Sequence, residues 1–220
     1  MSEYSAVHSL RIGGLTGIKM VVAAFGLLCG ITGIIAGIFE ILQGNIPTKG
    51  YVISTIGPHY LMYEDFTYFA ITILPNFMLT GILAIIFSSL VILWSVKYVQ
   101  KKNGVWALLT LSVSQMLVGG GWVIDLAIIT CLLATRINKP LNYWRKNLPV
   151  NIRIVLVKLF PFSFYAYTLV SLSMLVLTII GVNSYVLIKL LEPLAVVMFI
   201  PIILLIFGGI TYEIQKQQII

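Results

Sequence analysis

Three carboxylates lie in or beside apolar runs that are long enough to cross a bilayer: Glu40, Asp125 and Glu192. A carboxylate near the membrane interior is costly unless it is protonated, paired or hydrated, and such residues often handle protons or cations. If the three residues converge on the outer side, they would form an acidic vestibule. Proton or cation handling is therefore the chemistry that these residue types indicate.

Each acid also has a structural interpretation, which we favour on the sequence alone. Asp125 follows a glycine triplet, and Asp suits the first turn of a helix or the outer interface. Glu40 ends the first apolar run, so a tilted helix would place it at the outer boundary. Glu192 lies three residues after Lys189, close enough on a helix for the two charges to pair.

Other reactive patterns are absent from the sequence. It contains no HExxH, GxSxG, phosphate-loop or dinucleotide-binding motif. The two cysteines, Cys29 and Cys131, stand inside apolar runs, and His8 and His59 are far apart. We therefore predict no metal site and no cofactor. Asn76 follows Pro75, a pair that could kink a helix or bridge two helices by hydrogen bonding.

The composition places the whole chain in a membrane. Of 220 residues, 60% are hydrophobic and 10% are charged, whereas a soluble domain needs about a quarter charged. The runs are too long for barrel strands, so we expect helices. The first run also exceeds the apolar region of a cleaved signal peptide. We predict one transmembrane domain over 1–220, with full spans near 16–41, 72–96, 160–182 and 185–210.

The basic residues predict the orientation of the chain. All 14 Lys and Arg except Lys49 and Lys189 fall on one side if both termini are cytoplasmic, as the positive-inside rule requires. In a plasma membrane, this places segment 43–71 on the external side and segment 136–159 on the cytoplasmic side. The competing arrangement, one long tilted helix over 105–135, would put six basic residues outside.

Segments 97–104 and 136–158 lie on the same side in this orientation. The region between them must therefore enter the membrane and return. Glycines 119–121 suit a tight turn, which predicts a hairpin with arms 105–118 and 122–135. Each arm rises roughly 21 Å at 1.5 Å per residue, against about 30 Å of hydrocarbon. A re-entrant hairpin and two short spans both remain open. The predicted fold is thus an all-α, N-in and C-in polytopic bundle of four full spans plus this hairpin, six apolar helices in all.

A stripe of small residues follows one face of the first span. Its glycines are spaced three or four residues apart, so they share a helix face, and small residues let membrane helices approach closely. The partner helix could belong to this chain, to a second copy or to another membrane subunit. The predicted packing seam consists of Gly26, Gly30, Gly33 and Gly37.

The basic segment 136–159 is predicted to contact lipid. Tyr143 and Trp144 stand among its cations, and such mixtures mark the headgroup level and favour anionic lipids. The net charge of +7 therefore indicates lipid rather than nucleic acid. Residues 149–160 could form an interfacial helix or an early start to the next span. The predicted headgroup contacts are Arg136, Arg145, Lys146 and Arg153.

Several strings between residues 30 and 165 resemble a family of uncharacterised prokaryotic polytopic membrane proteins. They are TGILAI at 80–85, VQKKNG at 99–104, LVGGG at 117–121, and ATRINKPL at 134–141 followed by YWR at 143–145. The resemblance implies a membrane protein and implies no activity. Members of that family favour a proline-containing segment where this chain has Trp122 to Asp125.

Three functions follow from these patterns. The first is an accessory or structural subunit that packs through its glycine seam. The second is a small solute or ion permease, or a channel, that uses the central hairpin. The third and least favoured is an enzyme that acts on membrane lipid, because the sequence lacks a cluster of His or Cys residues.

Overall fold

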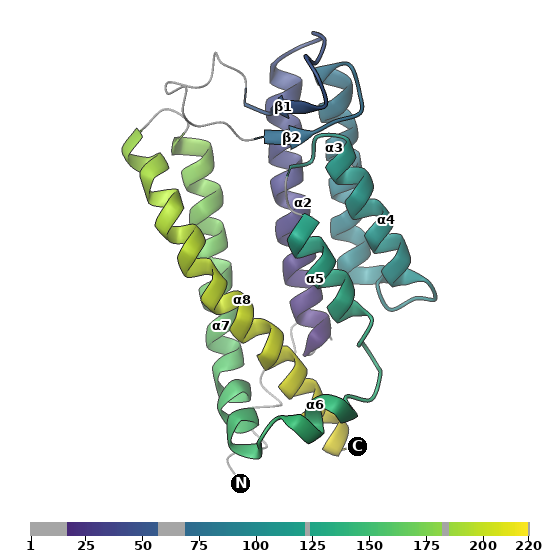
Figure 1. Ribbon diagram of the computed structural model, residues 1–220, viewed down its shortest axis with the longest axis vertical. Helices are drawn as coiled ribbons and strands as arrows, with labels where there is room; N and C mark the ends of the chain where they lie inside the picture. The colour runs from purple at the N-terminus through teal and green to yellow at the C-terminus, as the bar shows by residue number, and fades with distance from the viewer. Residues whose placement is uncertain (1–16, 57–68, 122–123, 182–184, 220) are drawn as a thin grey trace.

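The protein is a bundle of long helices. The computed structural model describes residues 17–56, 69–121, 124–181 and 185–219, and 76% of the chain is helical. Four helices are long and apolar enough to cross a membrane (Figure 1), and they make this a multi-pass membrane protein. They contain the segments Ile18–Leu42 (α2), Phe77–Tyr98 (α3 and the π-helical η2), Val150–Leu177 (in α7) and Pro193–Gln217 (in α8).

Helices α2 (Ile18–Leu42) and α3 (Phe77–Leu93) lie side by side along the predicted glycine seam. A side chain at Gly26 would collide with Ser95 of η2 (Trp94–Tyr98), and one at Gly37 would come within 2.7 Å of the Gly81 carbonyl oxygen. The stripe therefore packs against the same chain. The small residues of the seam let the two helix backbones approach closely.

The second span begins later than the sequence predicts, at Phe77 rather than near residue 72. Asn76 caps the helix, because its side chain accepts a hydrogen bond from the Leu79 amide at 3.1 Å. It also donates to the Asn45 side chain at 2.6 Å. Pro75 precedes the helix, so it does not kink it.

The residues before α3 form a small sheet. Strand β2 (Phe69–Ile71) pairs antiparallel with β1 (Val52–Ser54), and Ile53 stands opposite Ala70. His59 lies outside the described residues. The sheet covers one end of α2 and α3 (Figure 1), where the predicted external loop lies.

The central region does turn back on itself. Helix α4 (Gly104–Leu117) runs toward the sheet and α5 (Ile124–Ala134) returns toward the end where α4 began. Gly119, with φ +92°, makes the turn and donates its amide to the Ile71 carbonyl at 2.9 Å. The Ile73 amide donates to the Leu117 carbonyl at 3.0 Å. The tip of the hairpin thus joins the β sheet through backbone hydrogen bonds.

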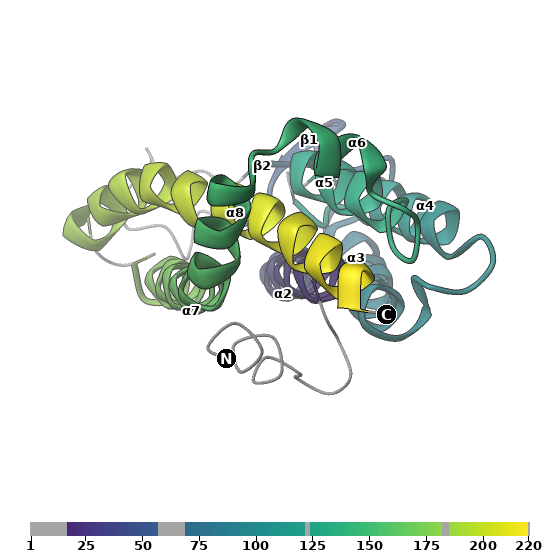
Figure 2. The same cartoon turned by 90° about the horizontal axis from the view of Figure 1, so that it is seen from below.

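The last two helices, α7 and α8, pack against each other, and α8 contacts α2. Helix α7 (Val150–Gly181) starts before the predicted residue 160, so residues 150–160 belong to this span, while α6 (Asn142–Asn147) is a separate short helix. Helix α8 (Tyr185–Ile219) crosses the end of α2 (Figure 2). The rings of Phe160 and Tyr212 are 5.7 Å apart and join α7 to α8 at this crossing.

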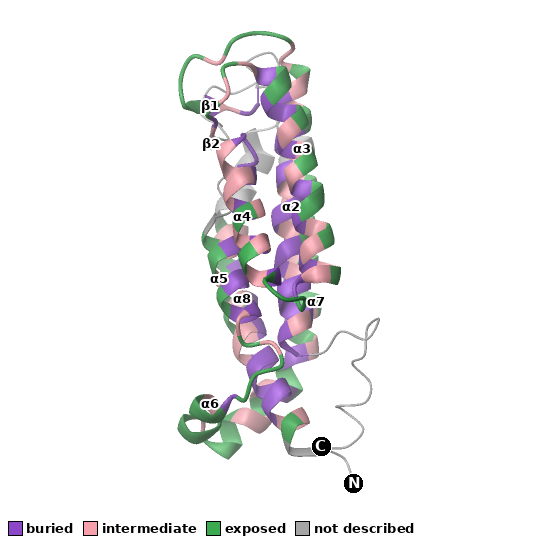
Figure 3. Cartoon of the chain, turned by 90° about the vertical axis from the view of Figure 1, so that its right-hand side faces the viewer, coloured by how far each residue is buried: buried purple, intermediate pink, exposed green. Residues whose placement is uncertain are grey.

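Burial follows the arrangement of the helices (Figure 3). Phe25, Leu108 and Leu205 are fully buried where the helices meet. The outward face of α7 is apolar and exposed, with Phe162 at 70% and Leu169 at 68%. In a membrane protein such a face contacts lipid tails, as the composition predicts.

Most of the described basic residues gather at the end of the bundle that carries α6, which we call the basic end; Lys189, near the start of α8, is an exception. They include Lys97, Lys101 and Lys102 after α3 and the cations of the segment after α5. Lys49 lies at the opposite end, beside β1. The basic residues are thus separated between the two ends as the positive-inside rule requires. Which end faces the cytoplasm stays a prediction.

The orientation can be tested by labelling intact cells with a membrane-impermeant maleimide. Cys29 and Cys131 are buried and would first be replaced by Ala. Lys49→Cys should then react, whereas Asn142→Cys should react only after the cells are opened. Lys146→Cys, also on α6, is the matched control and should behave like Asn142→Cys. Reaction of Lys49→Cys and Asn142→Cys from the same side would contradict both the orientation and the hairpin.

Gly37→Leu should destabilise the bundle by about 1–3 kcal/mol, because the new side chain overpacks the contact with Gly81 and Ala84. The readout is the melting temperature of the protein in detergent. Ile38→Leu is the control, because Ile38 is 46% exposed on the other face of α2 and should leave the melting temperature unchanged. Equal effects of the two substitutions would mean that α2 and α3 do not pack through this seam.

Candidate functional site: a buried carboxylate beneath the hairpin turn

Glu40 is the most unusual polar residue of the described structure. It lies in the last turn of α2 with 0% exposure, and both of its carboxylate oxygens lack a hydrogen-bond partner. The favoured sequence interpretation places Glu40 at the membrane boundary. The hairpin turn and α3 cover it at that end of α2.

The turn at Gly119 closes directly over the carboxylate. A side chain at Gly119 would collide with both oxygens of Glu40 and with the methyl group of Thr80. Glu40 and Thr80 therefore face the same point beneath the turn. The hydroxyl of Thr80 lies 3.2 Å from that of Thr72, and both residues are buried. The methyl group of Thr80 thus faces the carboxylate, while its hydroxyl is paired with that of Thr72.

A second buried polar group lies deeper in the bundle. Gln115 of α4 is 1% exposed and donates to the Cys29 carbonyl at 2.8 Å. The Gln115 amide and the Ser88 hydroxyl both occupy the space that a side chain at Gly33 of α2 would fill. The Ser88 hydroxyl oxygen is buried and lacks a hydrogen-bond partner.

These groups form a discontinuous line of polar side chains inside an apolar bundle, interrupted where Ala84 and Ile85 pack against Gly37. Gly33 is two helical turns from Glu40, or roughly 10 Å at 1.5 Å per residue. The line therefore extends from beneath the hairpin turn toward the middle of α2. We call it the polar line, and its members are Glu40, Thr80, Gln115 and Ser88.

The polar line defines what Glu40 can do chemically. An ionised carboxylate that is buried without a partner is strongly unfavourable. Glu40 must then carry a proton, or its charge must be balanced by a cation that its oxygens bind. The arrangement is thus suited to hold and release a small positive charge.

Asp125 occupies a different place from Glu40. It is exposed and lies in the first turn of α5, as its helix-start interpretation predicts. Glu40, in contrast, is fully buried. The structure therefore does not bring Asp125 and Glu40 into one vestibule. The side chain of Glu192 lies outside the described residues.

Glu213 is a buried carboxylate that the sequence analysis missed. It lies near the end of α8, 5% exposed, with one oxygen 4.0 Å from the ammonium of Lys216 and the other against Gly17. The predicted span ends at residue 210, short of Glu213. The signal was available, because the sequence after residue 210 lacks a helix breaker.

The other predicted site residues lie on the surface of the basic end. Arg136, Arg145 and Lys146 are exposed and Arg153 is half-buried, so the first three can reach headgroups. Among the described residues, no three His, Cys, Asp or Glu side chains are grouped so that they could hold a metal ion.

Comparison of the chain with protein-family models, curated proteins and solved structures finds no match. The resemblance to a family of uncharacterised prokaryotic membrane proteins therefore stays a prediction.

The closure of the turn over Glu40 can be tested with Gly119→Ala. Gly119 and Gly44 both have a left-handed backbone, with φ +92° and +87°, but a side chain at Gly44 would meet nothing within 4 Å. Gly44→Ala should cost about 1–2 kcal/mol through backbone strain alone. Gly119→Ala should lower the melting temperature further, because it adds a collision with Glu40 and Thr80. Equal losses would show that the turn does not cover the carboxylate.

Proposed function

We propose that this chain is a small multi-pass permease for a monovalent cation, either a proton or an alkali-metal ion, and that Glu40 binds the cation. The observation that carries the proposal is the complete burial of Glu40 with both carboxylate oxygens unpartnered. Ionisable residues inside membrane bundles mark ion pathways and proton relays by default.

The surroundings of Glu40 favour a single positive charge. One carboxylate neutralises one monovalent cation, whereas a divalent ion would leave a net charge in an apolar site, at a large cost. The hydroxyls of Thr72 and Thr80 lie 3.2 Å apart. These hydroxyls and the carboxylate are oxygen groups of the type that hard cations prefer.

The hairpin turn is the element that could open this site. It is attached to the end of the bundle that carries the β sheet, which we call the β end. The attachment consists of hydrogen bonds from Gly119 to Ile71 and from Ile73 to Leu117. Moving the turn away would expose Glu40 toward that end without separating α2 from α3. Toward the middle of α2 the next buried polar groups of the polar line are Gln115 and Ser88, which lie at Gly33. A cation bound at Glu40 would thus be covered by the turn on the side of the β sheet.

The proposed orientation places the basic end and both chain termini in the cytoplasm and the β end outside a plasma membrane. The concentration of basic residues at one end supports it. In this orientation Glu40 lies near the outer end of α2, and the hairpin turn separates it from the outside.

The alternative is an accessory or structural subunit that packs with other membrane helices. The glycine seam, which suggested it, packs within the chain against Gly81 and Ser95. The observation that still favours this function is the exposed apolar face of α7, including Phe162 and Leu169. A subunit of this kind would retain a stoichiometric partner through that face after mild solubilisation.

Flux into liposomes tests the proposed function. The purified protein should carry protons, seen with a pH-sensitive dye, or Na⁺ or K⁺, seen with an ion-sensitive dye. Glu40→Gln keeps the shape of the side chain and removes its charge, so it should reduce flux to that of protein-free liposomes. It should still fold, because it removes a buried ionisable group.

Asp125→Asn is the matched control, since Asp125 is exposed on α5 and lies outside the polar line. It should keep the flux of the unsubstituted protein. Flux that is the same with and without Glu40, or no flux of any of these cations in the unsubstituted protein, would contradict the proposal.

A further inference from the structure

A separate cavity opens at the basic end, away from Glu40. It has a volume of about 510 Å³ and lies between two corners of the chain. One corner joins η2 to α4 over residues 99–109, and the other follows α5 over residues 135–139. This volume is in the range of sites that bind small organic ligands.

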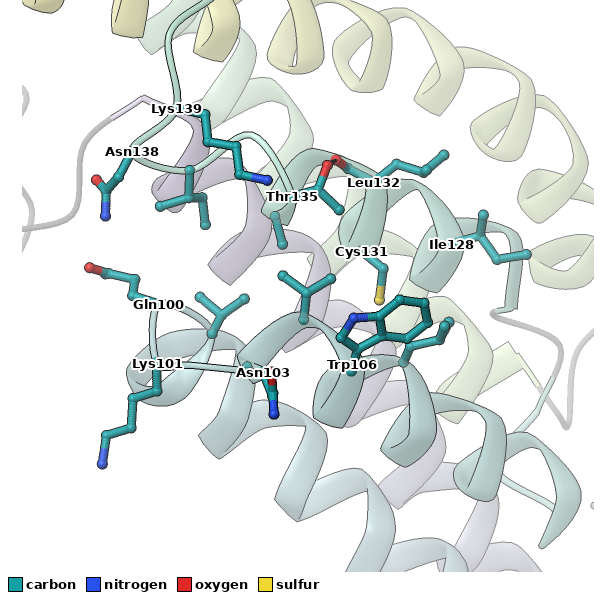
Figure 4. Close-up of a pocket in the computed structure, with 16 residues that line it drawn as sticks. Gln100, Lys101, Asn103, Trp106, Ile128, Cys131, Leu132, Thr135, Asn138 and Lys139 are labelled. Atoms are coloured by element: carbon teal, nitrogen blue, oxygen red, sulfur yellow. Dashed lines mark hydrogen bonds between the residues drawn. The ribbon is translucent and has the colours of Figure 1, made fainter.

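The walls of the cavity divide into an apolar part and a polar mouth (Figure 4). Trp106, Ile128 and Leu132 form the apolar part, and Trp106 is 71% exposed, which is unusual for so large a side chain. Around the mouth lie amides, a hydroxyl and two lysines, and the lining residues include no acid. The polar lining residues are Gln100, Lys101, Asn103, Thr135, Asn138 and Lys139.

The two lysines play different parts. The ammonium of Lys101 sits 4.6 Å from the ring centre of Tyr98, and in Figure 4 its side chain points away from the cavity. The side chain of Lys139 is directed inward, toward Thr135 (Figure 4). Lys139 therefore supplies the positive charge of the mouth.

Hydrogen bonds fix both corners of the chain, so the shape of the cavity is set by the fold. The Trp94 indole donates to the Gly104 carbonyl at 3.0 Å and holds the first corner. The Gln217 side chain of α8 donates to the Lys139 carbonyl at 2.9 Å and holds the second. The backbone around Lys139 is thus tied to the end of the last helix.

We infer that this cavity binds one anionic phospholipid from the leaflet at the basic end, with its phosphate at Lys139 and an acyl chain against Trp106 and Leu132. A cation beside a Trp at the end of a membrane helix matches the headgroup level of a bilayer. A lipid has both the charge and the apolar chain that the two parts of the cavity require. A soluble anion would use only the mouth.

Quenching of Trp106 fluorescence by brominated lipid tests the inference. The intact protein is placed in phosphatidylcholine nanodiscs that contain brominated phosphatidylglycerol, or brominated phosphatidylcholine at the same mole fraction. The quenching that is lost in Trp106→Phe is the signal from the cavity. We expect the anionic lipid to reach half-maximal quenching at a mole fraction about fivefold lower, as one basic contact predicts.

Lys139→Gln should make the two quenching curves coincide. Lys146→Gln, which removes an exposed charge on α6 outside the cavity lining, should keep the fivefold preference. Coincident curves in the unsubstituted protein would overturn the inference. So would an equal loss of preference in Lys139→Gln and Lys146→Gln, which would indicate general accumulation of anionic lipid at a basic surface.

Inorganic phosphate distinguishes a lipid from a free anion. Exchanging chloride for phosphate at constant ionic strength should leave the quenching by brominated phosphatidylglycerol unchanged. Relief of quenching by phosphate would show that the mouth takes a soluble anion, and it would overturn the assignment to lipid.

Discussion

Helices α2 and α3 approach closely enough for the backbone of one to touch the other, at Gly37 and Gly81. Without water to drive apolar association, membrane helices gain their contact energy from such packing. The other elements are arranged around this pair. The β sheet covers one end, the hairpin lies along one side, and α8 crosses the opposite end. The close contact also fixes the surroundings of Glu40, because residue 40 follows Gly37 by less than one turn.

Burial of Glu40 is a consequence of this packing combined with the hairpin. The carboxylate lies where α2, α3 and the turn at Gly119 meet, so three segments far apart in the sequence exclude water from it together. An ionised group in such a place needs a compensating charge. In the proposed function, binding of a proton or a metal ion would be coupled to the position of the turn, because the turn separates Glu40 from the β end.

Much of the fold could be predicted from residue patterns, but the site could not. Long apolar runs predicted the four long helices, because length and hydropathy are local properties. The start of α3 was placed several residues early, because Thr72 to Leu74 are as compatible with a strand end as with a helix. The environment of Glu40 depends on contacts with Thr80 and Gly119, which periodicity does not reveal. Periodicity identifies a helix face and leaves its partner open.

The most direct test of the account is the infrared difference spectrum of the purified protein with and without Glu40→Gln. At neutral pH, without the transported metal ion, the account predicts a protonated carboxyl band that the Glu40→Gln variant lacks. Adding that ion, or raising the pH if the proton is the substrate, should convert the band to a carboxylate. A carboxylate signal from Glu40 that is present from the start and responds to neither change would contradict the account.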